Sequence, residues 1–190
     1  MNAILPTFQT VDEFLRWSAV QENGRYELER GRIVVMQAEN AGHVRTKIRI
    51  ANILAAAIQS AGVAYYSMSD GMTVRVPGGR AYEPDALIAP LPEVTDDALE
   101  VPNPVAVFEV LSPTPTSVRR DLTDKVVGYA LVASIEHYIV IDPADRVVLH
   151  FRRRGDLLVP PAEPTVDILR LDAVGIEVAI EAMLGAKPTT

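Results

Sequence analysis

The sequence predicts an α/β domain, close to the α+β border, in which helices flank a central mixed β-sheet. Two apolar segments near the middle of the chain, 82–89 and 105–111, have the length and composition of buried strands. Two others, 40–60 and 117–133, carry apolar residues at three- and four-residue steps, which is helical spacing. Helices inserted between strands give a layered architecture, and 190 residues suffice for one domain with its own core.

The first third of the chain predicts a helix, a hairpin and a longer helix. Thr10 and Glu13 have the spacing of a capping box, so a short helix should begin there and reach about Ala19. Residues 25–36 alternate around a glycine, which indicates two short strands. The helix over 40–60 should end at a glycine, and its expected buried stripe is Val44, Ile48, Ala51, Ala55 and Ile58.

The remaining elements follow from alternation and turn residues. Further strands are expected over 63–68, 72–76, 137–141 and 146–152, with weak ones around 157 and 166–169. The segment 90–104 is rich in proline and acid and predicts a surface loop. In the helix over 117–133 the expected stripe is Val118, Leu122, Val126, Tyr129 and Val132, and a short helix is expected over 177–184.

Composition limits the possible functions. Hydrophobic residues make up 48% of the chain and charged residues 23%, as in soluble globular proteins. No apolar run is long enough to span a membrane, and the N-terminus lacks the pattern of a signal peptide. The absence of cysteine excludes disulfides and thiolate metal sites. We therefore expect a cytoplasmic protein without a membrane partner.

The formal net charge of −7 argues against tight, non-specific binding of nucleic acid. It does not exclude a nuclease, because carboxylates that await a cation also add negative charge. The basic residues gather at 45–49, 119–120 and 152–154. Each of these groups is most simply interpreted as a solvated face.

Two carboxylates stand in apolar surroundings. Glu109 lies within the apolar segment 105–111, and Asp85 follows Pro84 within the other. An unpaired carboxylate is costly to bury, so each needs a cationic partner or an open strand end. Either could belong to a structural ion pair, but together, on consecutive strands, they suit a hard cation such as Mg²⁺, with Mn²⁺ as an alternative.

Lys125 is the third candidate site residue. Only three of the 18 basic residues are lysine, and Lys125 borders the apolar face of its predicted helix. A compact ammonium can approach a metal-bound water and a phosphate where a planar guanidinium would not fit. A simple helix pair with Asp121, four residues earlier, is the alternative.

The chain resembles the Uma2 family within the PD-(D/E)XK nuclease superfamily. The matching pieces run in family order from about residue 7 to 151: Tyr26-Glu27-Leu28 with Gly31, His43, Pro84-Asp85, Glu109 to Pro113, Asp121 to Lys125 with Tyr129, and His137 to Pro143. The resemblance implies a restriction-endonuclease-like fold in one domain, 1–190. Its core would span about 7–151, with an extension over about 152–190.

The resemblance also supplies supporting residues and one departure. Glu27 would be a further acid of the site, although a hairpin salt bridge with a nearby arginine is an alternative. His43 would contact the phosphate or water, or else be only a surface or capping residue. The usual third motif has lysine two residues after the acid, where this chain has Leu111. Lys125, on the following helix, would take its place.

The expected activity is Mg²⁺-dependent hydrolysis of DNA by an endonuclease, with Asp85, Glu109 and the carbonyl of Val110 as metal ligands. A non-catalytic relative that binds nucleic acid or protein is one alternative, and hydrolysis of RNA or a nucleotide is another. Nucleases of this superfamily often cut two strands with two subunits, so the resemblance also implies a homodimer.

Overall fold

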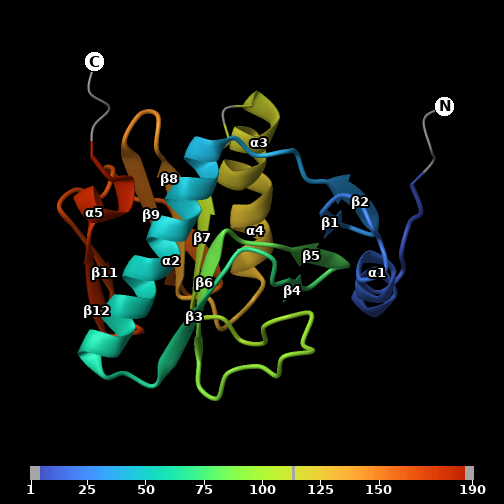
Figure 1. Ribbon diagram of the computed structural model, residues 1–190, viewed down its shortest axis with the longest axis horizontal. Coiled ribbons are helices and arrows are strands. Elements are labelled where there is room, and N and C mark those ends of the chain that lie inside the picture. Colours follow the sequence, from blue (N-terminus) through green and yellow to red (C-terminus); the bar gives the residue numbers. More distant parts are fainter. Residues whose placement is uncertain (1–4, 113, 187–190) are drawn as a thin grey trace.

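A six-stranded sheet forms the centre of the molecule (Figure 1). The computed structural model describes residues 5–112 and 114–186, so Pro113 lies outside it. The strands, in spatial order, are β10 (Leu157–Val159), β9 (Val147–Arg154), β8 (His137–Asp142), β7 (Ala106–Val110), β6 (Ala86–Pro90) and β3 (Tyr65–Ser69). β7 and β8 are parallel and the other neighbours antiparallel. The predicted mixed sheet flanked by helices is confirmed.

Two smaller sheets lie beside the central one. The first has the order β2 (Arg32–Val35), β1 (Tyr26–Glu29), β5 (Arg80–Tyr82) and β4 (Val74–Val76). Helix α1 (Val11–Ser18) packs against β1 and begins with the predicted capping box at Thr10. The second is the hairpin of β11 (Ile168–Leu171) and β12 (Ile176–Ala179), which is followed by α5 (Ile180–Leu184).

Helix α2 (Ala41–Ala61) covers one face of the central sheet. Asn40 caps its first turn, and Gly62 ends it in the left-handed conformation at φ +62°. The predicted buried stripe is wrong at three of its five positions, because Val44 is 39% and Ile48 56% exposed and Ala55 is exposed as well. The buried face instead begins with His43 and Lys47 and continues through Ile50, Leu54 and Ile58. The half of the helix near its N-terminus thus faces polar groups.

The opposite face carries an interrupted helix where one continuous helix was predicted. It consists of α3 (Pro115–Arg119), a π-helical turn η1 (Arg120–Asp124) and α4 (Lys125–Ala130). The N–H of Lys125 donates to the carbonyl of Arg120, five residues back, which defines the wider turn. The residues that η1 and α4 bury are Asp121, Lys125, Gly128 and Tyr129.

Two further predicted elements differ in the structure. The expected strand over 82–89 is divided into β5 and β6, because Pro84 has no N–H to donate to a sheet ladder. The expected helix over 177–184 begins three residues later, and its first part belongs to β12. There Ile176 and Val178 alternate with exposed neighbours, which is the pattern of a strand.

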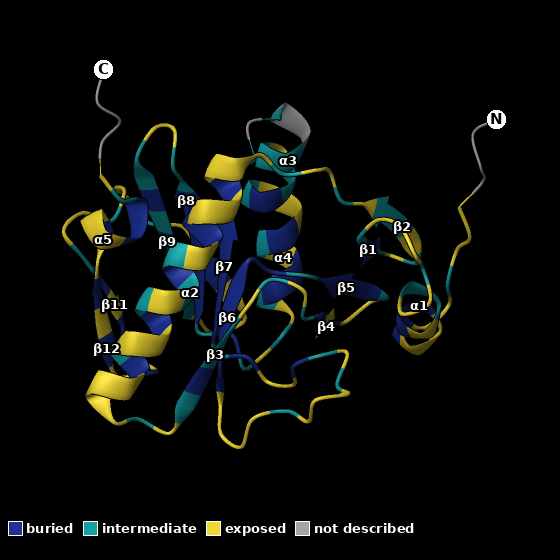
Figure 2. Cartoon of the chain, in the orientation of Figure 1, coloured by how far each residue is buried: buried dark blue, intermediate teal, exposed yellow. Residues whose placement is uncertain are grey.

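Apolar cores lie on both faces of the central sheet. One packs β6, β7 and β8 against α2, β11, β12 and α5, so residues after 168 complete it. The other packs the reverse face against α4 and includes Tyr82, Tyr129 and Tyr138. In Figure 2 the strand β7 is buried along its length and β6 up to its last residue, whereas α2 has one exposed side. Within the described chain, no helix has the length and hydropathy needed to cross a membrane.

Candidate active site

Asp85 and Glu109 lie side by side on one face of the central sheet. Ala86 is paired with Phe108, and the same register places Asp85 opposite Glu109. The N–H of Asp85 donates to the carbonyl of Phe108 at 2.9 Å, and the N–H of Val110 donates to Asp85 Oδ2 at 2.6 Å. Both side chains are buried. The fixed backbone of β7 therefore orients both predicted acids.

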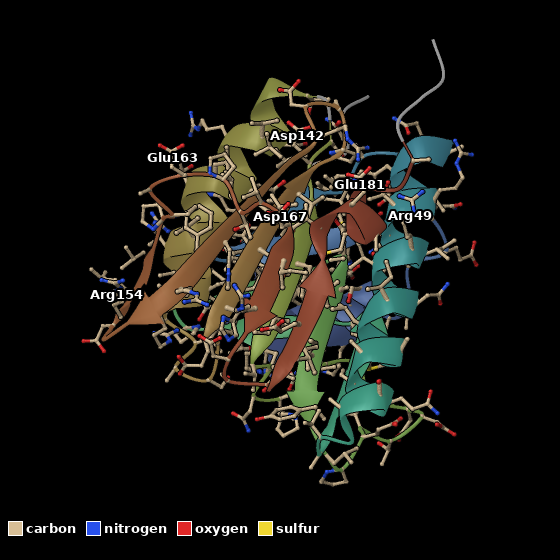
Figure 3. The ribbon with its side chains drawn as sticks, turned by 90° about the vertical axis from the view of Figure 1, so that its left-hand side faces the viewer. Arg49, Asp142, Arg154, Glu163, Asp167 and Glu181 are labelled. Carbon is tan, nitrogen blue, oxygen red and sulfur yellow. The ribbon has the colours of Figure 1, made fainter. Side chains whose placement is uncertain are left out.

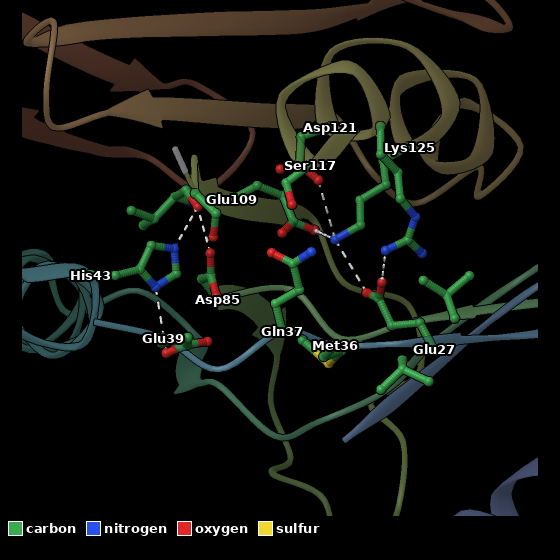
Figure 4. Close-up of a pocket in the computed structure, with 15 residues that line it drawn as sticks. Glu27, Met36, Gln37, Glu39, His43, Asp85, Glu109, Ser117, Asp121 and Lys125 are labelled. Carbon is green, nitrogen blue, oxygen red and sulfur yellow. Dashed lines mark hydrogen bonds and ion pairs between the residues drawn. The ribbon is translucent and has the colours of Figure 1, made fainter. Parts of the chain in front are cut away.

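Lys125 reaches this pair of acids from the first turn of α4 (Figure 4). Its Nζ lies 2.7 Å from Glu109 Oε1, 3.2 Å from Glu27 Oε1 and 3.6 Å from Asp121 Oδ1. The ion pair with Asp121 that the helix spacing suggests is thus present, but it is the longest of the three. Tyr129, which the sequence places in the core, is buried there and donates its hydroxyl to Glu109 Oε1 at 2.9 Å.

Glu27 lies on β1 and is buried against the same lysine. Its Oε1 accepts a hydrogen bond of 2.8 Å from the N–H of Glu83, and its Oε2 is paired with Arg120. The expected arginine partner exists, but it comes from η1 instead of the hairpin. Glu27 therefore connects the small sheet to the helical layer at the predicted site.

His43 has its two ring nitrogens in different surroundings. Nε2 lies 2.7 Å from the carbonyl oxygen of Val110, which can only accept, so Nε2 carries the proton. In the neutral ring Nδ1 then has a lone pair; this atom is buried without a hydrogen bond and lies 3.4 Å from Glu39 Oε2. Asn40 is the cap of α2 and His43 is buried, so His43 is neither the capping residue nor the surface residue that the sequence allows as alternatives.

Several residues near the site were not predicted from the sequence. Lys47 is buried, with Nζ 2.5 Å from Glu39, 2.8 Å from Asp70 and 3.3 Å from Asp85. It is not part of a solvated face with its neighbours, and the rarity of lysine that singled out Lys125 applies to it equally. Arg120 Nη2 is buried and has no hydrogen-bond partner.

Burial and neighbouring charges shift the pKa values of these groups in different directions. Burial, together with the nearby acids, raises the pKa of Glu109 well above its ordinary value despite Lys125. Burial also raises the pKa of Asp85, although Lys47 opposes it. Burial alone would raise the pKa of Glu27, but Lys125 and Arg120 outweigh it and hold the pKa low. Carboxylates whose pKa values are shifted in opposite directions within one cluster are typical of functional sites.

The donor atoms that converge are suited to a divalent cation. Glu39, His43 and Asp85 each offer one ligand atom, and the three atoms lie within 4.8 Å of one another. In the neutral ring the buried Nδ1 of His43 has the chemistry of a metal ligand, and the Nε2–H donates to a carbonyl as metal-bound histidines do. Glu109, an expected ligand, holds Lys125 through Oε1.

The predicted acids, the lysine and His43 line one cavity of about 140 Å³. Gln37, Ser112 and Ser117 are among its other lining residues, and Figure 4 shows Gln37 between the groups of Asp85 and Lys125. All five predicted side chains, together with Val110, therefore border the same space. Their roles in chemistry stay predictions.

Comparisons with known proteins agree with this architecture. The family model of Uma2, described as a putative restriction endonuclease, matches residues 11–181. The fold is similar to the crystal structure of a putative nuclease belonging to DUF820 from Anabaena variabilis ATCC 29413. That similarity has a TM-score of 0.65 at 15% identity and covers 92% of this chain and 97% of the other. No curated protein matches the chain. From the match over most of its length, the chain belongs to the Uma2 family.

Proposed function

We propose that the protein is a metal-dependent endonuclease that hydrolyses phosphodiester bonds of DNA, with Mg²⁺ or Mn²⁺ as its cofactor. The observation that carries this proposal is one cavity where the carboxylates of Asp85 and Glu109, a buried lysine and the buried, unpartnered Nδ1 of His43 meet. A family described as a putative restriction endonuclease supports a nuclease. The DNA substrate and the choice of ion are our inference.

Asp85, His43 and Glu39 would hold the cation, and Glu109 and the carbonyl of Val110 lie at the same cavity as further oxygen donors. When bound, the ion would act as a Lewis acid toward the scissile phosphate and would lower the pKa of water. The donor set of carboxylates and one imidazole is compatible with Mn²⁺ as well as Mg²⁺. Lys47, beside Asp85 and Glu39, would keep these carboxylates oriented.

Lys125 would donate from Nζ to the attacking water or to a non-bridging phosphate oxygen. Its contacts with Glu27, Glu109 and Asp121 fix the ammonium in position before substrate arrives, and such preorganisation is a large source of catalytic power. Arg120 Nη2, a buried donor without a partner at this cavity, would bind a second phosphate oxygen.

Cleavage of plasmid DNA tests the proposal. We expect purified protein to cut supercoiled plasmid with Mg²⁺ or Mn²⁺, Asp85→Asn to abolish cutting, and Asp97→Asn, which changes an exposed carboxylate of the loop 90–104, to cut as the native chain does. Cleavage of RNA or a nucleotide without cleavage of DNA would mean that the substrate is another phosphoester. The proposal fails if no substrate is cut and calorimetry finds no metal binding that Asp85→Asn removes.

A further inference from the structure

A second cavity, with basic and apolar residues in its wall, lies toward the other end of the central sheet. Glu109 is beside Val140, near the end of β8, whereas His137 begins β8 beside Ala106. The cavity measures about 400 Å³ and lies between β9, the segment after β10, and β11. Figure 3 shows this face of the molecule, with Arg154 at the end of β9. It has no lining residue in common with the candidate active site.

The cavity is lined by basic residues that strand alternation brings to one face. His150, Arg152 and Arg154 alternate along β9 and line it together with Arg170 of β11. Arg153 points the other way and donates to carbonyls at the end of α4, at 2.7 Å for Val132. The sequence predicts one solvated face for the arginines at 152–154. In the structure Arg152 and Arg154 line the cavity, whereas Arg153 binds backbone carbonyls at the end of α4.

A chain of hydrogen bonds fixes the proton positions of two buried histidines beside this cavity. The backbone N–H of Ala173 can only donate, and it lies 3.2 Å from Nε2 of His137, which must therefore accept. His137 Nδ1 carries its proton and donates to Nε2 of His150 at 2.9 Å. The remaining nitrogen of neutral His150, Nδ1, must then carry a proton.

This Nδ1–H of His150 has no hydrogen-bond partner among the described residues. His150 is 93% buried, being 7% exposed, and its ring borders the cavity. Burial and the neighbouring His137 and Arg152 hold the pKa of His150 down at about 3, so the ring stays neutral and keeps this arrangement at ordinary pH. Among the described residues the buried side-chain atoms without a partner are His43 Nδ1 and Arg120 Nη2, so the Nδ1–H of His150 is open to solvent and is available to donate to a ligand in the cavity.

The charges around the cavity leave room for an anion. Arg152 is paired with Asp172 at 3.1 Å and Arg170 with Glu177 at 2.8 Å, while Arg154 has no ion pair within the described chain. A guanidinium has five N–H donors, so each single carboxylate contact leaves others available. None of the described residues lining the cavity is acidic, although the whole chain carries a net charge of −7.

We propose that this cavity is a second ligand site, which binds a phosphate group through Arg152, Arg154 and Arg170, with the Nδ1–H of His150 as a neutral donor. Arginine forks match the oxygens of a phosphate, and their hydrogen bonds are charge-assisted. The hydroxyl-bearing Thr165, held at the rim by its N–H bond of 2.8 Å to the carbonyl of Val148, adds a further polar group. The phosphate comes from a small free ligand or from a nucleic acid backbone.

Nuclear magnetic resonance tests the donor and the ligand together. We expect ¹⁵N spectra of the histidines to show the proton of His150 on Nδ1. Pyrophosphate should then shift that resonance and the amide of Ala173 in a saturable way. A proton on Nε2 of His150, or resonances that pyrophosphate leaves unmoved, would overturn the proposal.

Two variants separate a built site from general charge. The double change Arg152→Gln and Arg154→Gln should weaken pyrophosphate binding at these resonances about tenfold or more, as expected for the loss of charge-assisted bonds. Arg75→Gln, at an arginine of similar exposure (42% against 47% for Arg152) on another strand, should leave it unchanged. Equal weakening by both would overturn the proposal and indicate an adventitious ion only.

The source of the phosphate follows from competition. A short DNA duplex that displaces pyrophosphate from the His150 and Ala173 resonances supports a backbone phosphate as the natural ligand. Shifts with pyrophosphate that the duplex does not compete for support a small free phosphate ligand. Because these resonances lie away from the cavity of Asp85 and Lys125, their response does not depend on whether the protein cuts DNA.

Discussion

Individual side chains at the candidate site have environments that their neighbours set. Lys125 is held by three acids, and the closest, Glu109, also accepts from Tyr129. Such a buried network is costly to disturb, because removing one partner leaves the others unsatisfied. Single substitutions at this site should therefore separate charge from geometry.

Lys125→Met and Lys125→Arg should both reduce DNA cleavage by about 100-fold or more, since a positioned donor at a reacting phosphate contributes on this order. The arginine keeps the charge, but its planar head does not fit the space of Nζ among Glu27, Glu109 and Asp121. Rates of plasmid nicking in Mg²⁺ measure the loss, with thermal unfolding as a check on folding. A fully active Lys125→Arg would contradict a geometric role.

His43→Gln should weaken Mn²⁺ binding about tenfold or more. Glutamine can still donate to the carbonyl of Val110 but lacks the Nδ1 lone pair that faces Glu39, so the fold keeps its contact while the cation loses a ligand. Calorimetric titration measures the affinity, and Asp97→Asn serves as a surface control. Unchanged affinity in His43→Gln would assign the ion to the carboxylates and the Val110 carbonyl instead.

The sequence identifies some of these residues and hides others for a physical reason. Asp85 and Glu109 are visible because each interrupts an apolar strand. Glu39 lies in a polar segment before α2, where an acid is unremarkable, and Lys47 stands between two arginines. Only the direction of the buried face of α2 distinguishes Lys47 from Arg45 and Arg49, and apolar periodicity misplaces that face.

At the scale of elements, both helices that flank the central sheet turn polar residues toward the cavity. Apolar spacing predicts that they exist, but it misplaces their buried faces, both near the site and at Ala55 in the second half of α2. In α2 the buried stripe begins with His43 and Lys47, and in η1 and α4 it contains Asp121 and Lys125. At the ends near the cavity, ion pairs take the place of the apolar packing that the spacing predicts.

The π-helical turn η1 sets the direction of Lys125 relative to α3. A π turn holds one residue more than an α turn, so deletion of the exposed Thr123 should restore an α-helix and rotate α3 against α4 by about 100°. We expect unchanged helix content by circular dichroism but loss of cleavage. Thr123→Ala, which keeps the length, should remain active. Cleavage at the native rate after the deletion would show that η1 does not position the site.

Across the whole molecule, the parallel strands β7 and β8 connect two polar regions. The acids and lysine lie near the C-terminal end of β7, and the buried histidine pair lies near the start of β8. The pair also fixes the segment around Ala173 to the sheet, and this segment connects β11 with β12, which complete one apolar core. Protonation of the histidines therefore affects more than one layer of the fold.

The histidine pair should make folding stability fall as the pH falls below about 6.5. Burial, then the positive charge of Arg152, lowers the pKa of His137 to about 4, and burial, His137 and Arg152 lower that of His150 to about 3, while Asp172 opposes both shifts. Unfolded histidine titrates near about 6.5. Between these values the unfolded chain holds protons that the folded chain does not, so acid favours unfolding by up to about 1.4 kcal/mol per pH unit for each histidine.

Urea unfolding at pH 7 and pH 5 measures this effect, with the double variant His137→Asn and His150→Asn as the control. The variant loses the hydrogen bonds of the pair and should be less stable than the native chain at pH 7. Its stability should nevertheless fall less toward pH 5, because it lacks the two histidines whose pKa values are lowered by folding. The raised pKa values of Glu109, Asp85 and Asp121 act equally in both proteins and cancel in the comparison. Parallel pH profiles would mean that the histidines take up protons as readily in the folded protein as in the unfolded chain, which would contradict the neutral hydrogen-bond chain from Ala173 through His137 to His150.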